Sequence, residues 1–215
     1  MMPVLYYFLL RTKPRLRKLA VNKETQLVIE GFPRSGNTFA VVSFESAKIS
    51  HIKIAHHLHA PAQIIRSAMY GIPLLVLIRE PVDAIASYMI RDESVTIADA
   101  FCDYIKFYEY VCKYRDQIFL ARFEDVISDF GIVLEGVNAK YLTKFTLFEH
   151  TPENEDKVFS KIDDYSKKLN AGELGVARPS LSRAHLKERL LGEIMSLEYT
   201  KLRDKADALY RMLVS

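Results

Sequence analysis

Residues 27–38 read LVIEGFPRSGNT, an apolar run followed by a tight turn and the start of a helical stretch. From Gly31 to Thr38 the stretch fits the phosphate-binding pattern G-x-x-x-x-G-K-[ST] at every position except one, because Asn37 stands where the lysine belongs. Backbone N–H groups of such a turn, with a helix N-terminus behind them, form an anion-binding cradle. Arg34 puts a permanent positive charge inside this loop. The stretch therefore predicts an anion site between a strand and a helix, and an ordinary turn capped by Asn-Thr is the alternative.

Elsewhere the chain alternates short apolar runs with helical periodicity, which indicates strands joined by helical crossovers. We expect strands at Leu27–Gly31, Ile52–His56, Pro73–Arg79 and Ile118–Phe123, and helices at about 38–49, 60–70, 82–91 and 96–115. Beyond residue 123 the pattern is mostly helical, with a loop at about 171–182. This order predicts an α/β fold: a three-layer α/β/α arrangement with a largely parallel central sheet and a helical C-terminal part.

Length and composition are typical of one globular domain over residues 1–215. Hydrophobic residues make up 49% of the chain and charged residues 27%. The formal net charge of +3 is too small to indicate nucleic-acid binding, but it is compatible with a pocket for a polyanionic small molecule. Cys102 and Cys112 are the only cysteines, and they lack metal-ligand spacing. We expect two half-buried thiols on one helix, in a reducing compartment, rather than a disulfide or a zinc site.

The first 22 residues are expected to form an N-terminal helix or extension whose role the sequence leaves open. Val4–Leu10 is apolar but too short to span a bilayer. The positive charges of RTKPRLRK follow this apolar run, whereas a secretory signal peptide carries them before it. We expect a packed first helix in a cytoplasmic protein, and a short membrane-surface anchor is the alternative.

Three unusual polar residues lie at the ends of the predicted strands. Arg34 comes after the first strand, His57 after the second, and Arg79 at the end of the third. Open parallel sheets bind ligands outside the carboxyl ends of their strands, so we expect these residues at one edge. Arg79 would offer a charged fork to a phosphate. The alternative is a strand-end arginine paired with Asp83 or Glu80.

Two stretches resemble signatures of the sulfotransferase family. GFPRSGNTF at 31–39 is similar to the family's 5′-phosphosulfate loop. LLVLIREPVDAIASYMIR at 74–91 is similar to the segment in which a strand ends in Arg-[Asp/Asn/Glu]-Pro and a helix supplies a serine. The resemblance implies a P-loop-like fold, 3′-phosphoadenosine 5′-phosphosulfate as the donor, adenosine 3′,5′-bisphosphate as the product, and no metal. It implies donor binding by Arg34, Ser35, Gly36, Asn37, Thr38 and Phe39, and 3′-phosphate binding by Arg79 and Ser87.

Two other stretches resemble the family less fully. VARPSLSR at 176–183 is similar to the basic C-terminal loop that closes over the nucleotide, which implies Arg178 and Ser180 as further contacts. The family's lysine-glycine pair is absent from it, and a solvated loop is the alternative. ARFEDVISD at 121–129 is similar to the segment after the family's fourth strand. Glu124 and Asp125 would open a helix there and buttress basic residues of the site.

Three histidines, His56, His57 and His59, follow the second predicted strand. A histidine can take a proton from an acceptor hydroxyl near neutral pH. The family register selects His57 as the base, in preference to His59, which is an alternative. Some members use a glutamate instead, so Glu30 and Glu45 are the alternatives. We expect the segment to be extended, so that the alternation of side chains puts His57 and His59 on one face and His56 on the other.

An aromatic-rich stretch, FCDYIKFYEYVCKY at 101–114, has apolar residues at i, i+3 and i+4 spacing. The spacing predicts a helix stripe that faces the core, formed by Phe101, Tyr104, Ile105, Tyr108, Val111 and Cys112. The functional alternative is that Tyr104 or Tyr108 lines a pocket for the acceptor.

The resulting hypothesis is a sulfotransferase that acts by in-line displacement at sulfur. His57 would remove the acceptor proton, and Arg34 with the loop amides would stabilise the developing charge. The acceptor, a carbohydrate, lipid, small alcohol or phenol, and the oligomeric state are left open. We expect no nucleic-acid partner and no membrane span. One alternative is a P-loop-type kinase. It is disfavoured because the third strand ends in Arg79-Glu80-Pro81 and offers no aspartate as a magnesium ligand. The other alternative is a non-catalytic nucleotide-binding protein.

Overall fold

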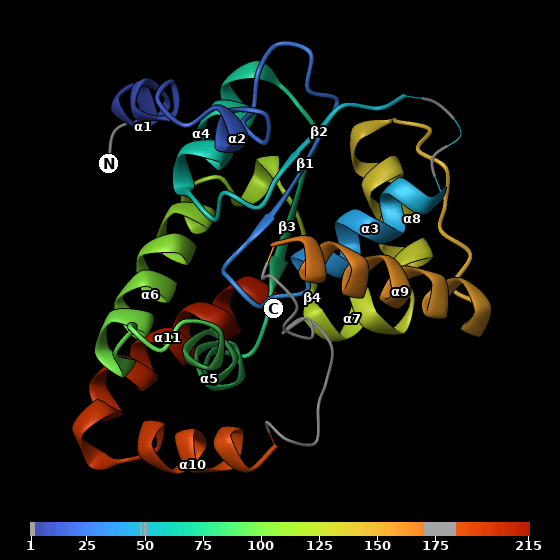
Figure 1. Cartoon of the computed structure of the whole chain (residues 1–215). Coiled ribbons are helices and arrows are strands. Elements are labelled where there is room, and N and C mark those ends of the chain that lie inside the picture. Colours follow the sequence, from blue (N-terminus) through green and yellow to red (C-terminus); the bar gives the residue numbers. More distant parts are fainter. Residues whose placement is uncertain (1–2, 48, 50, 170–183) are drawn as a thin grey trace.

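The computed structural model describes residues 3–215 apart from 48, 50 and 170–183 (Figure 1). Its centre is a sheet of four parallel strands, β1 (Leu27–Gly31), β2 (Ile54–His56), β3 (Leu74–Ile78) and β4 (Phe119–Arg122), in the order β2-β1-β3-β4. In the register of this sheet, Ile29 of β1 lies between His56 and Leu75. Because all four strands run parallel, their carboxyl ends meet at one edge.

The two central strands are buried on both faces, as their composition predicts. Every residue of β1 and β3 is buried, including the side chain of Glu30. Continuous apolar runs of this kind are typical of parallel strands that are covered by helices on both sides. The edge strand β4 is less buried and ends in the exposed Arg122.

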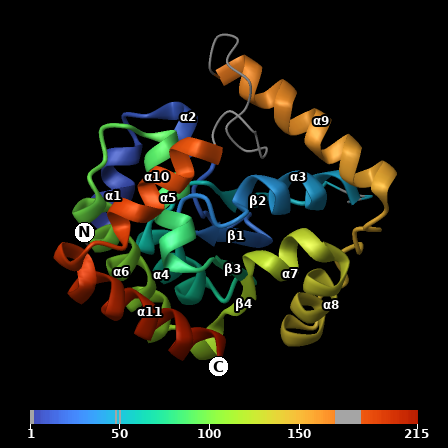
Figure 2. The ribbon, with the colours of Figure 1, turned by 90° about the horizontal axis from the view of Figure 1, so that it is seen from below.

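One side of the sheet is covered by α4 (Pro61–Tyr70), α5 (Pro81–Arg91), α6 (Ile97–Lys113), α10 (Ala184–Ile194) and α11 (Thr200–Val214) (Figures 1 and 2). Val76 and Ile78 of β3 point into this core because side chains alternate along a strand. The stripe of α6 is buried here at Phe101, Tyr104, Ile105, Tyr108 and Val111, which confirms the predicted core-facing stripe. Cys102 and Cys112 lie on the same helix as half-buried free thiols, also as expected.

The opposite side is covered by α3 (Asn37–Ala47), α7 (Phe123–Ser128), α8 (Phe130–Tyr141) and α9 (Pro152–Leu169) (Figures 1 and 2). Leu75 and Leu77 of β3 point into this second core. Val158 and Ile162 of α9 are buried in it as well. Two helical layers thus enclose one parallel sheet, the three-layer α/β/α arrangement that the sequence predicts.

The N-terminal segment forms two short helices, α1 (Pro3–Leu10) and α2 (Pro14–Arg17). α1 packs against α4, which confirms a packed first helix. None of the helices in the described part of the chain is both long and apolar enough to cross a membrane. Short 3₁₀ turns at Arg115–Gln117 and Leu197–Tyr199 complete the elements described.

The predicted bounds agree with the structure to within two residues at each of the four strands and at the four helices predicted between residues 38 and 115. The predicted loop at 171–182 lies outside the described residues.

Candidate functional site

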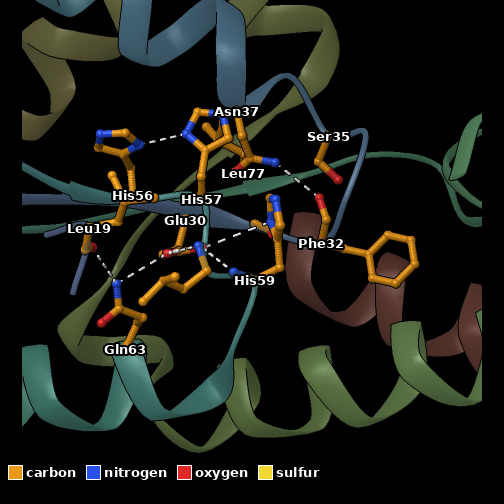
Figure 3. Close-up of polar contacts among 12 residues, drawn as sticks. Leu19, Glu30, Phe32, Ser35, Asn37, His56, His57, His59, Gln63 and Leu77 are labelled. Carbon is orange, nitrogen blue, oxygen red and sulfur yellow. Dashed lines mark hydrogen bonds and ion pairs between the residues drawn. The ribbon is translucent and has the colours of Figure 1, made fainter. Parts of the chain in front are cut away.

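The loop between β1 and α3 is a tight turn held by its own hydrogen bonds. Asn37, at the position of the missing lysine, is buried, and its Nδ2 donates to the Phe32 carbonyl at 3.0 Å (Figure 3). The Ser35 amide donates to the same carbonyl at 3.2 Å. Arg34 and Gly36 both have positive φ, 71° and 90°. A non-glycine residue in this region is strained, and such strain is concentrated at functional sites.

Two glycines let the loop approach its neighbours closely. A Cβ on Gly31 would lie 2.6 Å from the Leu77 carbonyl of β3. A Cβ on Gly36 would lie 3.2 Å from the Phe123 ring at the start of α7. The two glycines of the pattern therefore allow the loop to pack closely against β3 and α7, and they also allow the turn itself.

The two motifs of the sequence meet at the carboxyl ends of β1 and β3. Arg34 Nε donates to Ser87 Oγ on α5 at 2.9 Å. Arg79, which follows β3, donates from Nη1 to the Arg34 carbonyl at 3.2 Å. The chain thus joins residues 45 and 53 positions apart in one cationic cluster at the predicted edge of the sheet.

Arg79 is a half-buried cation with few partners. Its guanidinium lies over the Phe123 ring at 4.1 Å, and its Nε is buried without a hydrogen-bond partner among the described residues. Burial lowers the pKa of Arg79, while the charges of Asp83, Glu124 and Glu80 act in the opposite direction. The alternative ion pair with Asp83 or Glu80 is not formed within the described part of the chain. The Asp83 carboxylate instead binds a lysine of α10, and the Glu80 carboxylate accepts from the Asp83 amide as the cap of α5.

Two tyrosines of α6 support this edge from beneath. The Tyr104 hydroxyl donates to the Arg79 carbonyl, and the Tyr108 hydroxyl donates to the Leu77 carbonyl, both at 2.8 Å. Ser35 is also fully buried, and its hydroxyl lies 3.5 Å from that of Tyr108. Because both tyrosines are fully buried in the core, the structure assigns them to packing and support rather than to an acceptor pocket.

The histidines lie beside the N-terminus of α3. His57 Nε2 is 3.1 Å from Thr38 Oγ1, and His57 Nδ1 is 2.6 Å from His56 Nδ1 (Figure 3). The His57 ring also packs edge-to-face against the rings of both His56 and His59. The predicted alternation was wrong, because β2 ends at His56 and the backbone then turns through positive φ at His57 (57°) and His59 (48°).

Burial, together with the neighbouring His56 and His59, lowers the pKa of His57 to about 3. The imidazole of His57 is therefore neutral across the physiological range. A neutral imidazole keeps one lone pair for a proton, although burial makes it a weaker base than a free histidine. His59 differs in its contacts, because its Nδ1 donates to the Gly31 carbonyl at 2.7 Å, which leaves the lone pair of a neutral ring on Nε2.

Glu30 holds the turn that carries these histidines. Its two carboxylate oxygens accept from the amides of Leu58 and His59 at 3.0 and 2.9 Å (Figure 3). Gln63 of α4 donates to the same carboxylate at 3.3 Å and to the Leu19 carbonyl at 3.1 Å. Burial raises the pKa of Glu30. Glu30 thus positions the histidine turn, and Glu45, the other alternative base, is exposed on α3.

The structure bears on two further predicted roles, those of Phe39 and Asp125. Phe39 was predicted to bind the donor, but its ring is buried in the second core against Phe159, because its position on α3 turns it toward α9. Arg178 and Ser180 lie outside the described residues. Asp125 opens α7 as predicted, but its carboxylate pairs with Arg122, not with the cluster at Arg34.

Sequence reasoning missed Gln63 and Phe123 as parts of this region. Gln63 is fully buried in an amphipathic helix, so a polar residue on the apolar face of the 60–70 stretch was the available signal. Phe123 had no such signal, because only the fold brings it against Gly36 and Arg79. Among the residues that the structure describes, no group of three or more His, Cys, Asp or Glu side chains could hold a metal ion.

Neither a protein-family model nor a curated protein matches this sequence. Among solved structures, mouse sulfotransferase SULT7A1 complexed with PAP is similar to this chain, with 12% sequence identity and a TM-score of 0.49. The match covers 91% of this chain and 85% of that one. It carries no residue roles over to this chain.

Proposed function

We propose that this chain is a sulfotransferase that moves a sulfuryl group from 3′-phosphoadenosine 5′-phosphosulfate to a hydroxyl or amine of an acceptor. The observation that carries the proposal is the cationic cluster of Arg34, Arg79 and Ser87. The bond from Arg34 Nε to Ser87 Oγ, 2.9 Å long, joins the phosphate-binding loop to the helix after β3. A donor with phosphate at both its 5′ and its 3′ end needs two such cationic positions side by side.

The residues present fit such a donor. Arg79 Nε is buried and unpartnered among the described residues, so an anion oxygen would satisfy a donor that is otherwise orphaned. The Ser87 hydroxyl accepts from Arg34 and keeps its own hydrogen to donate. Arg34 is held at a positive φ, a strain that the fold maintains at the centre of the loop.

When bound, the donor supplies a sulfuryl group attached to a phosphate leaving group. Arg34 and the loop amides would stabilise the negative charge that develops during transfer. Arg79 and Ser87 would fix the nucleotide, so that the acceptor attacks an already oriented group.

His57 is the proposed base, and this role needs one particular tautomer of its ring. For Nε2 to accept a proton, His57 must carry its hydrogen on Nδ1 and donate it to His56 Nδ1. The Thr38 hydroxyl then donates its hydrogen to Nε2, 3.1 Å away. The acceptor hydroxyl would take the place of Thr38 at this nitrogen. The acceptor itself, whether carbohydrate, lipid, small alcohol or phenol, is left open.

The test measures nucleotide binding first and group transfer second. By calorimetry, adenosine 3′,5′-bisphosphate should bind without magnesium, and more tightly than ATP with magnesium. With labelled donor and an acceptor panel, Arg34→Ala should lower turnover by roughly 10²–10³, in line with loss of one transition-state donor, and should affect donor binding less.

His57→Ala should abolish transfer and leave the affinity for adenosine 3′,5′-bisphosphate nearly unchanged, while His59→Ala should cause only a partial defect. Magnesium-dependent phosphoryl transfer by the wild type would overturn the proposal in favour of a kinase. Bisphosphate binding without transfer to any acceptor would favour a non-catalytic nucleotide-binding protein.

A further inference from the structure

Helix α1 presents an apolar stripe to the outside of the molecule. Val4, Leu5, Phe8 and Leu9 are 77, 53, 62 and 46% exposed. Their i, i+1, i+4, i+5 spacing places them on one side of the helix. The opposite side carries the half-buried Tyr7 and the buried Leu10. The helix is therefore apolar on all sides, although only one side packs against the rest of the protein. Large apolar side chains that are exposed side by side mark an interaction surface.

The stripe is followed directly by a cationic segment. Residues 11–18 are all exposed, and they include Arg11, Lys13, Arg15, Arg17 and Lys18 without any acidic residue. The first 23 residues carry six basic and no acidic side chains, so the remaining residues carry 24 basic and 27 acidic ones. The net positive charge of the protein is therefore confined to the two N-terminal helices and their flanks.

α1 is fixed to the body of the protein, so the stripe has a defined orientation. The Tyr7 hydroxyl donates to Gln63 Oε1 of α4 at 2.6 Å. The Arg66 guanidinium, also of α4, lies 3.0 Å from the centroid of the Tyr7 ring. These contacts leave the apolar stripe exposed, with the cations immediately after it in the sequence. Figure 1 shows the arrangement of the helices α1, α2 and α4.

We infer that α1 and α2 dock the protein on an anionic lipid surface. Exposed apolar side chains of a short helix insert at the headgroup boundary, and adjacent Lys and Arg side chains are attracted by anionic headgroups. A second copy of the chain is the poorer occupant, because its contact would bring two segments of five cations together. The inference does not rest on the proposed transferase activity.

The experiment is co-sedimentation of the full chain with vesicles of phosphatidylcholine alone and of phosphatidylcholine with 30% phosphatidylserine. Wild-type protein should bind the anionic vesicles roughly tenfold more tightly than the vesicles of phosphatidylcholine alone. Addition of 0.5 M NaCl should weaken binding to the anionic vesicles, because the Debye length falls to only a few ångströms. Arg15→Glu with Arg17→Glu, and separately Phe8→Ser with Leu9→Ser, should each reduce binding roughly tenfold.

Matched controls come from exposed residues elsewhere in the described part of the chain. Lys140→Glu with Lys144→Glu repeats the charge change, and Ile132→Ser with Met212→Ser repeats the apolar change, on side chains that are exposed elsewhere. Both should bind vesicles as the wild type does. Thermal unfolding should be unchanged in all four variants.

Three outcomes would overturn the inference. The first is equal or absent binding to the two vesicle types. The second is loss of binding by the charge variant alone, with Phe8→Ser/Leu9→Ser unaffected, which would indicate a general polyanion site. The third is that light scattering without vesicles shows a dimer for the wild type and a monomer for Phe8→Ser/Leu9→Ser. This result would identify a second copy of the chain as the partner of the stripe.

Discussion

At the scale of single residues, the proposed function makes Arg79 the side chain that selects the nucleotide. Its guanidinium lies beside the loop of Arg34, and its buried Nε has no hydrogen-bond partner in the described part of the chain. A 3′-phosphate would therefore gain a charge-assisted bond there. We expect wild-type protein to bind adenosine 3′,5′-bisphosphate far more tightly than AMP. Arg79→Ala should lose about 1.5–3 kcal/mol of the bisphosphate affinity, and little of the AMP affinity, in calorimetry without magnesium.

Arg79→Lys separates charge from geometry, because a lysine ammonium is a point charge without the planar fork, and it should retain part of the preference. Arg122→Ala is the matched control, since Arg122 is an exposed arginine that ends β4 and pairs with Asp125 at 2.7 Å. Equal affinity of the wild type for both nucleotides would exclude Arg79 as the 3′-phosphate contact.

His57 makes a second residue-scale prediction, on stability against pH. Its pKa is lowered from 6.5 to about 3 in the folded protein, so the unfolded chain binds more protons between these values. The contribution of His57 to the free energy of unfolding is therefore complete above about pH 7 and is lost as the pH falls from 6.5 toward 3. His57→Gln should unfold with a flatter dependence on pH over this window than the wild type.

Urea unfolding at a series of pH values measures this difference, and His51→Gln, a change at an exposed histidine, is the control. Identical slopes for wild type and His57→Gln would show that His57 titrates normally. The same low pKa predicts that the rate of transfer shows no acidic limb from His57 between pH 5 and 8.

At the scale of elements, the packing of β1 against β3 depends on the absence of a side chain at Gly31. A Cβ there would lie 2.6 Å from the Leu77 carbonyl, an atom of the β3 backbone that cannot rotate away. We expect Gly31→Ala to lower the free energy of unfolding by about 1–3 kcal/mol through overpacking, as measured by urea unfolding.

Gly192→Ala in α10 is the control for this prediction. A Cβ on Gly192 meets nothing within 4 Å, and replacing a glycine within a helix by alanine should stabilise it by about 0.5–1 kcal/mol. A stable Gly31→Ala protein with unchanged nucleotide binding would mean that β1 and β3 can separate slightly without cost.

At the scale of the whole molecule, two cores on opposite sides of one sheet hold the site. The core of α4, α5, α6, α10 and α11 supplies Tyr104 and Tyr108 beneath the carboxyl end of β3. On the other side of the sheet, α7 begins with Phe123, whose ring lies under the Arg79 guanidinium. The cationic cluster lies at the carboxyl ends of β1 and β3, so its geometry depends on the register of these two strands.

Sequence alone determined the local features of this protein. The strands, the crossover helices, the buried stripe of α6 and the glycine-rich turn could be predicted because each depends on periodicity or on residues within about a turn of one another. The positions of Arg34, His57 and Arg79 at one edge also followed, since parallel strands end together.

Only the tertiary structure decided which of these residues touch. The periodicity of a sequence indicates which side chains are buried, but it does not indicate which residues they contact. The strand order β2-β1-β3-β4 therefore could not be predicted, nor could the hydrogen bond from Arg34 to Ser87. The same holds for the clamp of Glu30 on the turn after β2, because a buried carboxylate can be satisfied by any amide that the fold brings to it. The contact between the rings of His56 and His57 could not be predicted either. It forms because the backbone adopts a positive φ at His57, where the strand has ended and side chains no longer alternate.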